Sequence, residues 1–254
     1  MASPSAPAPR PGRAVDTGTP KALAAAAGTT FEALSRARGA RIFHPRGIAH
    51  AAVLHVGAAH RNYTGVPLLE HPGEHPAVVR FSRGVGLPEP LPDVLGVALR
   101  LLDAHGSSRH QDFLLATSGH PPLLRHLLLP GVGWFGQDFS SLLLYRVGGR
   151  IRVVGARAAS PVPAEGRGMP GLEAAAAGGS LRFRLTLASP GGRWEVIGEL
   201  VVGARLPDEE TEALAFTPWH SGGGILPVGP LMGVRRAAYR GSQRGRGLGD
   251  RQIP

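Results

Sequence analysis

The stretch LRFRLTL, residues 181–187, alternates strictly between apolar and polar side chains. A period of two is typical of a β-strand with one buried face. Gly191-Gly192 follows it, and then comes a second apolar-rich run, Trp194–Val202. Two such runs joined by a glycine-containing turn predict a β-hairpin.

Turn residues also separate short apolar runs upstream of that hairpin. Gly148-Gly149, a dipeptide suited to two-residue hairpin turns, joins the predicted strands Leu142–Val147 and Arg150–Ala156. Between the two hairpins, Ala158–Gly179 is predicted to be an irregular connection. Further strands are predicted at Arg41–Val56, Ala77–Ser82, Val94–Leu102 and Gln111–Thr117. The pattern predicts a mainly β (α+β) fold, an antiparallel β-barrel with flanking helices.

The two ends of the chain differ from this β-rich middle. Residues 1–20 are rich in Pro, Ala and Ser without periodicity and are predicted to form a disordered tail. Helices are predicted at Lys21–Arg38 and Leu231–Arg244, the second with arginines in its C-terminal half, where cations complement the helix dipole. We therefore expect a single domain over residues 21–246 and a short C-terminal tail over residues 247–254.

The amino-acid composition excludes several classes of protein. With 254 residues and 43% hydrophobic residues, the chain has enough apolar material for a substantial core. It has no Cys, which excludes disulfides and thiol nucleophiles. No apolar run approaches the roughly 18 residues of a membrane span, and the N-terminus lacks the apolar region of a secretory signal. A cytoplasmic protein without a membrane partner is expected.

The net charge of +10 comes almost entirely from arginine. Such an excess is compatible with an anionic partner such as nucleic acid. The arginines are scattered, however, with a local cluster only near Arg235–Arg251, so a nucleic-acid partner is not expected. The sequence also lacks H-E-x-x-H, G-x-S-x-G and P-loop motifs. A phosphoester hydrolase stays open as an alternative only because arginine suits phosphate.

Three segments, which follow one another along the chain, indicate a function. The first is RIFHPRGIAH at residues 41–50, and the second is VRFS at 79–82 followed by PDVLGVALR at 92–100. The third is RRAAY at 235–239, with Ser242, Arg244 and Arg246 after it. In this order and spacing they resemble the catalase superfamily, as does Pro218-Trp219-His220. The likeness spans roughly residues 41–246 and is greatest to short catalase-related members, which keep the heme barrel and lack the wrapping and C-terminal parts.

The resemblance implies a heme b cofactor with Tyr239 as the ligand of its iron, since tyrosine is the axial heme ligand of catalases. Tyrosine must ionise to take this role, although its phenol ordinarily loses a proton near pH 10. Arg235 lies four residues before Tyr239, and on a helix its guanidinium would favour the phenolate.

By the same resemblance, His44 is the base that moves a proton during peroxide cleavage, and Ser82 orients it by a hydrogen bond. Phe43 would pack against the edge of the macrocycle. The resemblance further assigns the two heme propionates to arginines, which pair well with carboxylates. These are Arg41, Arg80 and Arg246.

One departure from the family alters the expected activity. Typical catalases carry an Asn after the strand that corresponds to Gln111–Thr117, and its amide helps to orient hydrogen peroxide. Here Ala116 and Thr117 occupy that neighbourhood, and only Thr117 offers a hydroxyl donor. Losing one positioned donor costs about 10²–10³ in rate. We therefore expect a heme peroxidase that reduces hydrogen peroxide or organic hydroperoxides with an organic reductant, and weak or no dismutation.

A non-catalytic catalase-like barrel that serves as a binding module is the alternative. The missing amide and the missing wrapping segment favour it. Because the arms and wrapping segments that usually hold catalase oligomers together are largely missing, a monomer or homodimer is expected.

Overall fold

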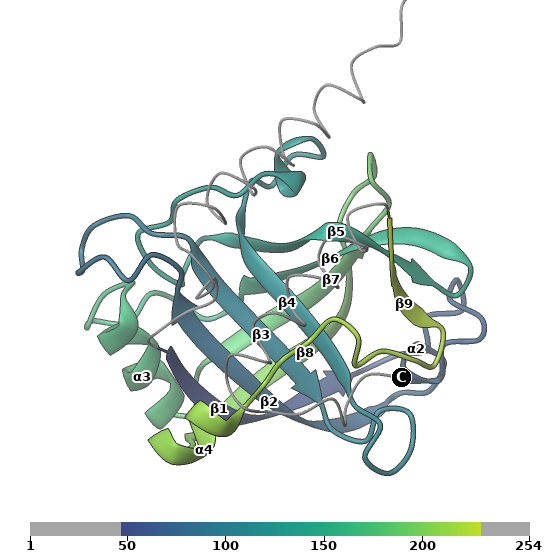
Figure 1. The fold of residues 1–254 in the computed structure, drawn as a ribbon, viewed down its shortest axis with the longest axis horizontal. Helices are drawn as coiled ribbons and strands as arrows, with labels where there is room; N and C mark the ends of the chain where they lie inside the picture. The colour runs from purple at the N-terminus through teal and green to yellow at the C-terminus, as the bar shows by residue number, and fades with distance from the viewer. Residues whose placement is uncertain (1–46, 230–254) are drawn as a thin grey trace, which may run out of the picture.

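A computed structural model describes residues 47–229 of the chain. Nine strands make up most of it (Figure 1). They are β1 (Gly47–Val56), β2 (Gly73–Arg83), β3 (Leu95–Leu101), β4 (Gln111–Ser118), β5 (Asp138–Val147), β6 (Arg150–Ala158), β7 (Arg182–Ala188), β8 (Glu195–Arg205) and β9 (Ile225–Val228).

The strands form one antiparallel sheet that closes on itself. Their order is β4-β3-β2-β1-β8-β7-β6-β5-β9, and an additional pairing of β4 with β5 closes the first eight into a barrel. Strand β5 takes part in both arrangements, since residues 138–140 pair with β4 and residues 144–147 pair with β9. Leu142, between these halves, has a φ of 57°. The mainly β fold predicted from the alternation is confirmed.

Aromatic side chains fill the barrel. Alternate residues along each strand point inward, as expected for a closed barrel, and Phe81, Phe139 and Phe183 are each at most 1% exposed. Trp134, from the loop between β4 and β5, stacks on Phe139 with ring centroids 5.9 Å apart and contacts Phe81 at 5.4 Å. The interior is a packed hydrophobic core, so a binding face is to be sought on the outside of the barrel.

Both predicted hairpins are present. Gly148 and Gly149 have φ values of 53° and 79°, the two positive angles that a type I′ turn between β5 and β6 requires. Strands β7 and β8 pair antiparallel, and the Gly192 N–H donates to the Ser189 carbonyl at 2.9 Å in the connection.

The prediction of an irregular connection over Ala158–Gly179 is wrong. Helix α3 (Met169–Ala177) lies within it and packs on β8. Pro170 in its first turn and Gly179, with a φ of 66°, just after its end are ordinary helix boundaries. The interior alanines 174–177 supply the helix propensity, and burial of Leu172 anchors it.

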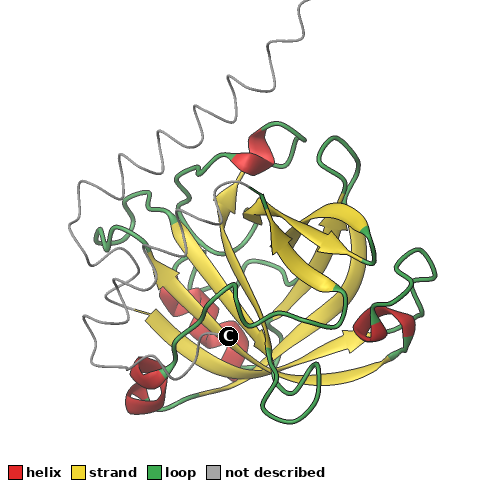
Figure 2. Cartoon of the chain, turned by 45° about the vertical axis from the view of Figure 1, so that its right-hand side comes forward, coloured by secondary structure: helices red, strands yellow, loops and turns green. Residues whose placement is uncertain are grey.

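Three other short helices and one strand complete the described part (Figure 2). The helices are α2 (Pro67–Glu70), a 3₁₀ helix at Leu124–His126 and α4 (Asp208–Ala213). Strand β9, which was not predicted from the sequence, is only four residues long and contains a proline, as edge strands allow. None of the helices within residues 47–229 has the length and apolar character needed to cross a bilayer. The predicted helices at Lys21–Arg38 and Leu231–Arg244, both tails and both ends of the predicted domain lie outside the described residues.

Candidate functional site

A row of small side chains crosses the outer face of the first four strands. Gly47 in β1 lies opposite Ser82 in β2, Ser82 lies opposite Gly96 in β3, and Gly96 lies opposite Ala116 in β4. Residues directly opposite each other in antiparallel strands point to the same side of the sheet. Their neighbour Phe81 belongs to the core, so this row points outward.

A second row lies two residues further along each strand. There Ala49 is opposite Arg80, Arg80 is opposite Ala98, and Ala98 is opposite the larger Leu114 in β4. Ala49 and Ser82 are buried although they point away from the interior. We call the set of small outward residues in the two rows the floor; its members are Gly47, Ala49, Ser82, Gly96, Ala98 and Ala116. None carries more than a methyl or hydroxymethyl group, so the floor itself is flat, and Leu114 borders it beside Ala98.

Arg80 borders the floor at Gly47. A Cβ atom on Gly47 would lie 2.8 Å from both Cζ and Nη2 of Arg80 and 2.7 Å from the Phe81 carbonyl oxygen. Only glycine therefore lets the guanidinium lie close over β1. The structure thus brings two of the predicted site residues, Ser82 and Arg80, to one face.

Thr117 lies on the other side of β4. Its side chain is fully buried, and its Oγ1 accepts a hydrogen bond of 3.1 Å from the Leu95 N–H. Its opposite neighbour in β5, Phe139, belongs to the core, which places Thr117 on the inner face. The structure therefore does not bring Thr117 together with Ser82, and the residue of β4 on the floor is Ala116.

Ser118 follows on the outer face and was not singled out from the sequence. It is 6% exposed, and its hydroxyl has no hydrogen-bond partner within residues 47–229. Its opposite neighbour Asp138 pairs with Arg157 at 3.0 Å on the outside of the barrel, which fixes the face. Ser118 is two residues after Ala116 in the same strand, and this spacing predicts that both point to the same face of the sheet.

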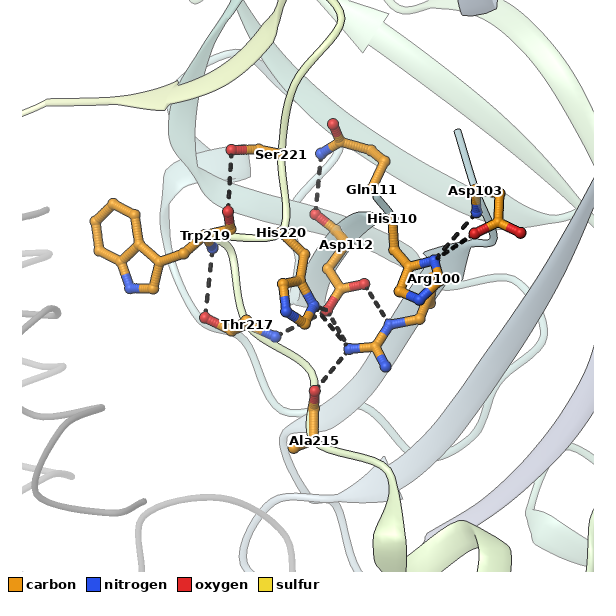
Figure 3. A network of polar contacts seen from close by, with 10 residues as sticks. All are labelled: Arg100, Asp103, His110, Gln111, Asp112, Ala215, Thr217, Trp219, His220 and Ser221. Atoms are coloured by element: carbon orange, nitrogen blue, oxygen red, sulfur yellow. Dashed lines mark hydrogen bonds and ion pairs between the residues drawn. The ribbon is translucent and has the colours of Figure 1, made fainter. Parts of the chain in front are cut away.

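A buried ion pair marks the far end of the floor (Figure 3). Arg100 in β3 lies opposite Asp112 in β4. Its Nε donates to Oδ1 and its Nη2 to Oδ2 of the Asp112 carboxylate, both at 2.7 Å. The Asp112 side chain is fully buried and that of Arg100 is 12% exposed. This bidentate geometry is the strongest form of arginine–carboxylate pairing.

The ion pair also holds the segment that runs from α4 to β9 across the outside of the sheet (Figures 1 and 3). We call residues 215–221 the strap. Arg100 Nη2 donates to the Ala215 carbonyl at 2.6 Å, and the Thr217 N–H donates to Asp112 Oδ2 at 2.9 Å. His220 Nδ1 lies 3.1 Å from the same Oδ2. The strap therefore docks onto β3 and β4 through one carboxylate.

Burial and hydrogen bonding act in opposite directions on Asp112. Burial by itself raises the pKa of its carboxyl, because it disfavours the charged form. The hydrogen bonds from Arg100, His220 and Thr217, with the charge of Arg100, outweigh burial and hold the pKa of Asp112 below its ordinary value. The carboxylate is thus the charged anchor of the strap at neutral pH.

The remaining predicted site residues lie outside the described part of the chain: Arg41, Phe43, His44, Arg235, Tyr239 and Arg246. Within residues 47–229, no group of three or more His, Cys, Asp or Glu is placed to hold a metal ion. The described side of the site is therefore the floor, with Arg80 at its edge, Ser118 beside it and the strap at its end.

Comparison with known proteins bears on the fold alone. No family model and no curated protein sequence matches the chain. Among solved structures, the chain is similar to a bacterial catalase, with a TM-score of 0.60 and 15% sequence identity. The match covers 86% of this chain and 60% of that catalase, so the chain spans less than two thirds of its length. Together with the closed eight-stranded antiparallel barrel, this likeness shows that the chain has a catalase-like fold.

Proposed function

We propose that the chain binds heme against the floor and reduces hydrogen peroxide or organic hydroperoxides, with weak or no dismutation. The observation that carries the proposal is the floor itself, the outward row of Gly47, Ser82, Gly96 and Ala116 with Ala49 and Ala98 beside it and Arg80 on the same face. The catalase-like fold and the ordered sequence segments support the same conclusion.

The described residues fit this cofactor. Heme is flat and carries two carboxylates, and the floor offers glycines and small side chains beside the Arg80 guanidinium, with Leu114 at its β4 edge. A Cβ at Gly47 would disturb that guanidinium, so the close approach depends on glycine. Tyr239, supported by Arg235, would hold the iron, and Arg41 and Arg246 would join Arg80 in binding the propionates.

The overall reaction takes a hydroperoxide, two electrons and two protons to an alcohol and water, the electrons coming from a small organic donor. Heme, when bound, supplies the redox centre that passes these electrons to the peroxide. The His44 imidazole takes the proton of the hydroperoxide and returns it to the leaving oxygen as the O–O bond breaks. Ser82 holds the other imidazole nitrogen and so keeps the ring oriented.

The methyl group of Ala116 explains why weak dismutation is part of the proposal. Ala116 stands in the same row as Ser82 and Gly96, where an amide would reach a peroxide above the floor. Without that donor the second peroxide molecule is held less well. A missing donor of this kind costs about 10²–10³ in rate.

Addition of hemin to the full chain tests the proposal. We expect a Soret band that saturates at one heme per chain, and oxidation of an aromatic donor that depends on organic hydroperoxide. Tyr239→Phe should lose the native band and at least about 99% of the turnover, because the charged iron ligand is removed. Arg109→Gln, a change of one exposed loop arginine, is the control and should retain both.

Ala98→Phe tests the location of the cofactor. A benzyl group on the floor would occupy the space of the ring system, and we expect heme affinity to fall by at least about a hundredfold, since overpacking leaves no room for relaxation. Arg184→Phe places the same side chain on the exposed face of β7, away from the floor, and should bind heme as the parent does. Equal heme affinity in the two variants would show that the floor is not the site.

A non-catalytic binding module is the second candidate, and Ala116 favours it because it offers no donor above the floor. This candidate predicts that the chain stays colourless after reconstitution with hemin. A chain that gains a Soret band and turns over hydroperoxide excludes it.

A further inference from the structure

We infer that the N-terminal segment Lys21–Arg38 docks on an apolar surface at the end of the barrel where β1 begins, and so holds residues 41–46 beside the floor. We call this apolar surface the loop surface. It consists of four side chains from the loops that follow β2 and β4, namely Val85, Leu87, Leu91 and Val132. The docking goes beyond the proposed function, whereas its consequence for His44 rests on that function.

The loop surface exposes large apolar side chains to water. Its four members are between 39% and 50% exposed. The Asp93 N–H donates to the Gly131 carbonyl at 2.9 Å, and the Gly131 N–H donates to the Asp93 carbonyl at 2.8 Å. These two hydrogen bonds join the loops, so Val132 continues the surface of the loop after β2. Exposed apolar side chains gathered in this way mark interaction sites.

Buried polar groups fix the loop after β2 with its apolar side chains outward. The buried Asp93 carboxylate accepts from the N–H groups of Val85 at 2.7 Å and Leu87 at 3.1 Å. The Arg83 guanidinium donates to the carbonyls of Leu87 at 3.0 Å and Leu91 at 2.7 Å. Because these bonds satisfy the backbone from within, the loop keeps its shape while its apolar side chains face water. A preformed surface of this kind loses little conformational entropy when a partner covers it.

The described part of the chain begins next to the loop surface. Gly47, the first residue of β1, lies opposite Ser82 in β2, and Val85 is only three residues after Ser82. The 46 residues before Gly47 therefore reach the barrel at the edge of the loop surface. A tethered segment has an effective concentration of about 1 mM at such a site, whereas a second copy must also give up translational freedom. The position of Gly47 thus favours the chain's own segment as the occupant.

The composition of the segment suits an apolar partner. Phe31 and Leu34 are three residues apart and share one face of the predicted helix. Leu34 is thirteen residues before Gly47, a link that spans at most about 40 Å. A single helix of this length is marginally stable in water, so it depends on a surface that covers its apolar face.

Docking would restrict the link between the segment and β1. Residues 39–46 form this link and contain His44. A link that is anchored at both ends has fewer conformations than a free tail, which keeps the His44 imidazole beside Ser82. The segment acts through His44 as a positioning element and does not contact the substrate.

Thiol labelling of the heme-free chain tests the docking. The chain has no Cys, so Val85→Cys places a single thiol on the loop surface, and Val196→Cys places one at an exposed position of β8 as the matched control. We expect Val85→Cys to react at least about tenfold more slowly than Val196→Cys. Adding Phe31→Asp and Leu34→Asp should raise the rate at Val85→Cys about tenfold, because docking would bury two carboxylates, and should leave Val196→Cys unchanged.

Three results would overturn the docking. Equal labelling rates at the two positions would show that nothing covers the loop surface. Protection that persists with both aspartates would assign the cover to another part of the chain. Protection that disappears on dilution, as light scattering shows a dimer becoming a monomer, would assign it to a second copy.

The heme-loaded chain tests the consequence for His44. Phe31→Asp with Leu34→Asp should keep the Soret band, because Tyr239 lies in the other terminal segment, and should lower kcat for the hydroperoxide at least about tenfold. In a His44→Ala background the two aspartates should have no further effect, since they act through the same imidazole. Equal turnover with and without the aspartates, or an undiminished effect in His44→Ala, would overturn this consequence.

Failure of the inference and failure of the proposed function are distinguishable. A chain that never acquires a Soret band overturns the proposed function and the consequence for His44, while thiol labelling still decides the docking. A chain that binds heme and turns over peroxide with an uncovered loop surface overturns only the inference.

Discussion

Asp112→Asn should lower the free energy of unfolding by about 3–5 kcal/mol, because it leaves the Arg100 guanidinium buried without a counter-charge. For a domain of this size the loss corresponds to a fall in melting temperature of roughly 10 °C. Asparagine keeps the shape of the side chain but turns one acceptor into a donor that faces Arg100 and the Thr217 N–H. Thermal unfolding followed by circular dichroism measures the effect.

The effect should depend on pH with a definite sign. The pKa of Asp112 is lower in the folded protein than in the unfolded chain. Its stabilising contribution is therefore complete above the ordinary pKa of an aspartate, about 4, and is lost as pH falls through the lowered folded value. The difference in melting temperature between the parent and Asp112→Asn should be largest near pH 7 and narrow below about pH 4.

The double variant Arg100→Met with Asp112→Asn is the control for this explanation. It removes the uncompensated charge, so it should be more stable than Asp112→Asn alone by at least about 1 kcal/mol. A single Asp112→Asn variant that melts within about 2 °C of the parent would show that the strap does not depend on this carboxylate.

Arg125→Ala should cost about 3 kcal/mol, a value typical of large-to-small substitutions at buried positions. Arg125 is 1% exposed and lies in the 3₁₀ helix that follows β4. Its guanidinium donates to the carbonyls of Ser189 at 3.2 Å and Gly192 at 3.0 Å, and it lies 4.3 Å from the ring centroid of Trp194. The side chain therefore fastens the loop after β4 to the turn between β7 and β8.

Arg125→Lys separates the charge from the shape of the guanidinium. Lysine keeps a cation but cannot bridge the two carbonyls with a planar fork, so it should recover less than half of the loss. Denaturant unfolding of the parent and both variants measures the differences. Full recovery by lysine would show that the charge over Trp194 alone holds the loop.

The two substitutions also bear differently on the site. Asp112 anchors the strap at the far end of the floor, whereas Arg125 holds the loop that begins directly after Ser118.

The strands and hairpins of the barrel were predictable from the sequence because they follow from local rules. The alternation in LRFRLTL and the Gly148-Gly149 turn specify strands and hairpins through side-chain period and backbone angles, both of which are properties of neighbouring residues. Helix α3 was missed although its proline and glycine boundaries were visible, since an Ala-rich run between strands was interpreted as a connection. Strand β5 was predicted to begin at Leu142 because the apolar run begins there, after Ser140-Ser141, whereas the pairing of residues 138–140 with β4 is a long-range contact.

The candidate site was predictable only in part. The three sequence segments that resemble catalases contain Ser82 and Arg80. In the structure both residues lie at the floor. Whether Ala116 or Thr117 faces the site depends on strand register, since a shift of one residue moves every side chain to the other face.

The sequence by itself determined the succession of strands and turns, and with it the class of the fold, because these depend on interactions between residues near each other in the chain. The tertiary structure alone decided which side chains meet. Asp112 and His220 are 108 positions apart, and Gly47 reaches Ala116 through two intervening strands. Such contacts are set by register and closure of the sheet, which no local pattern contains.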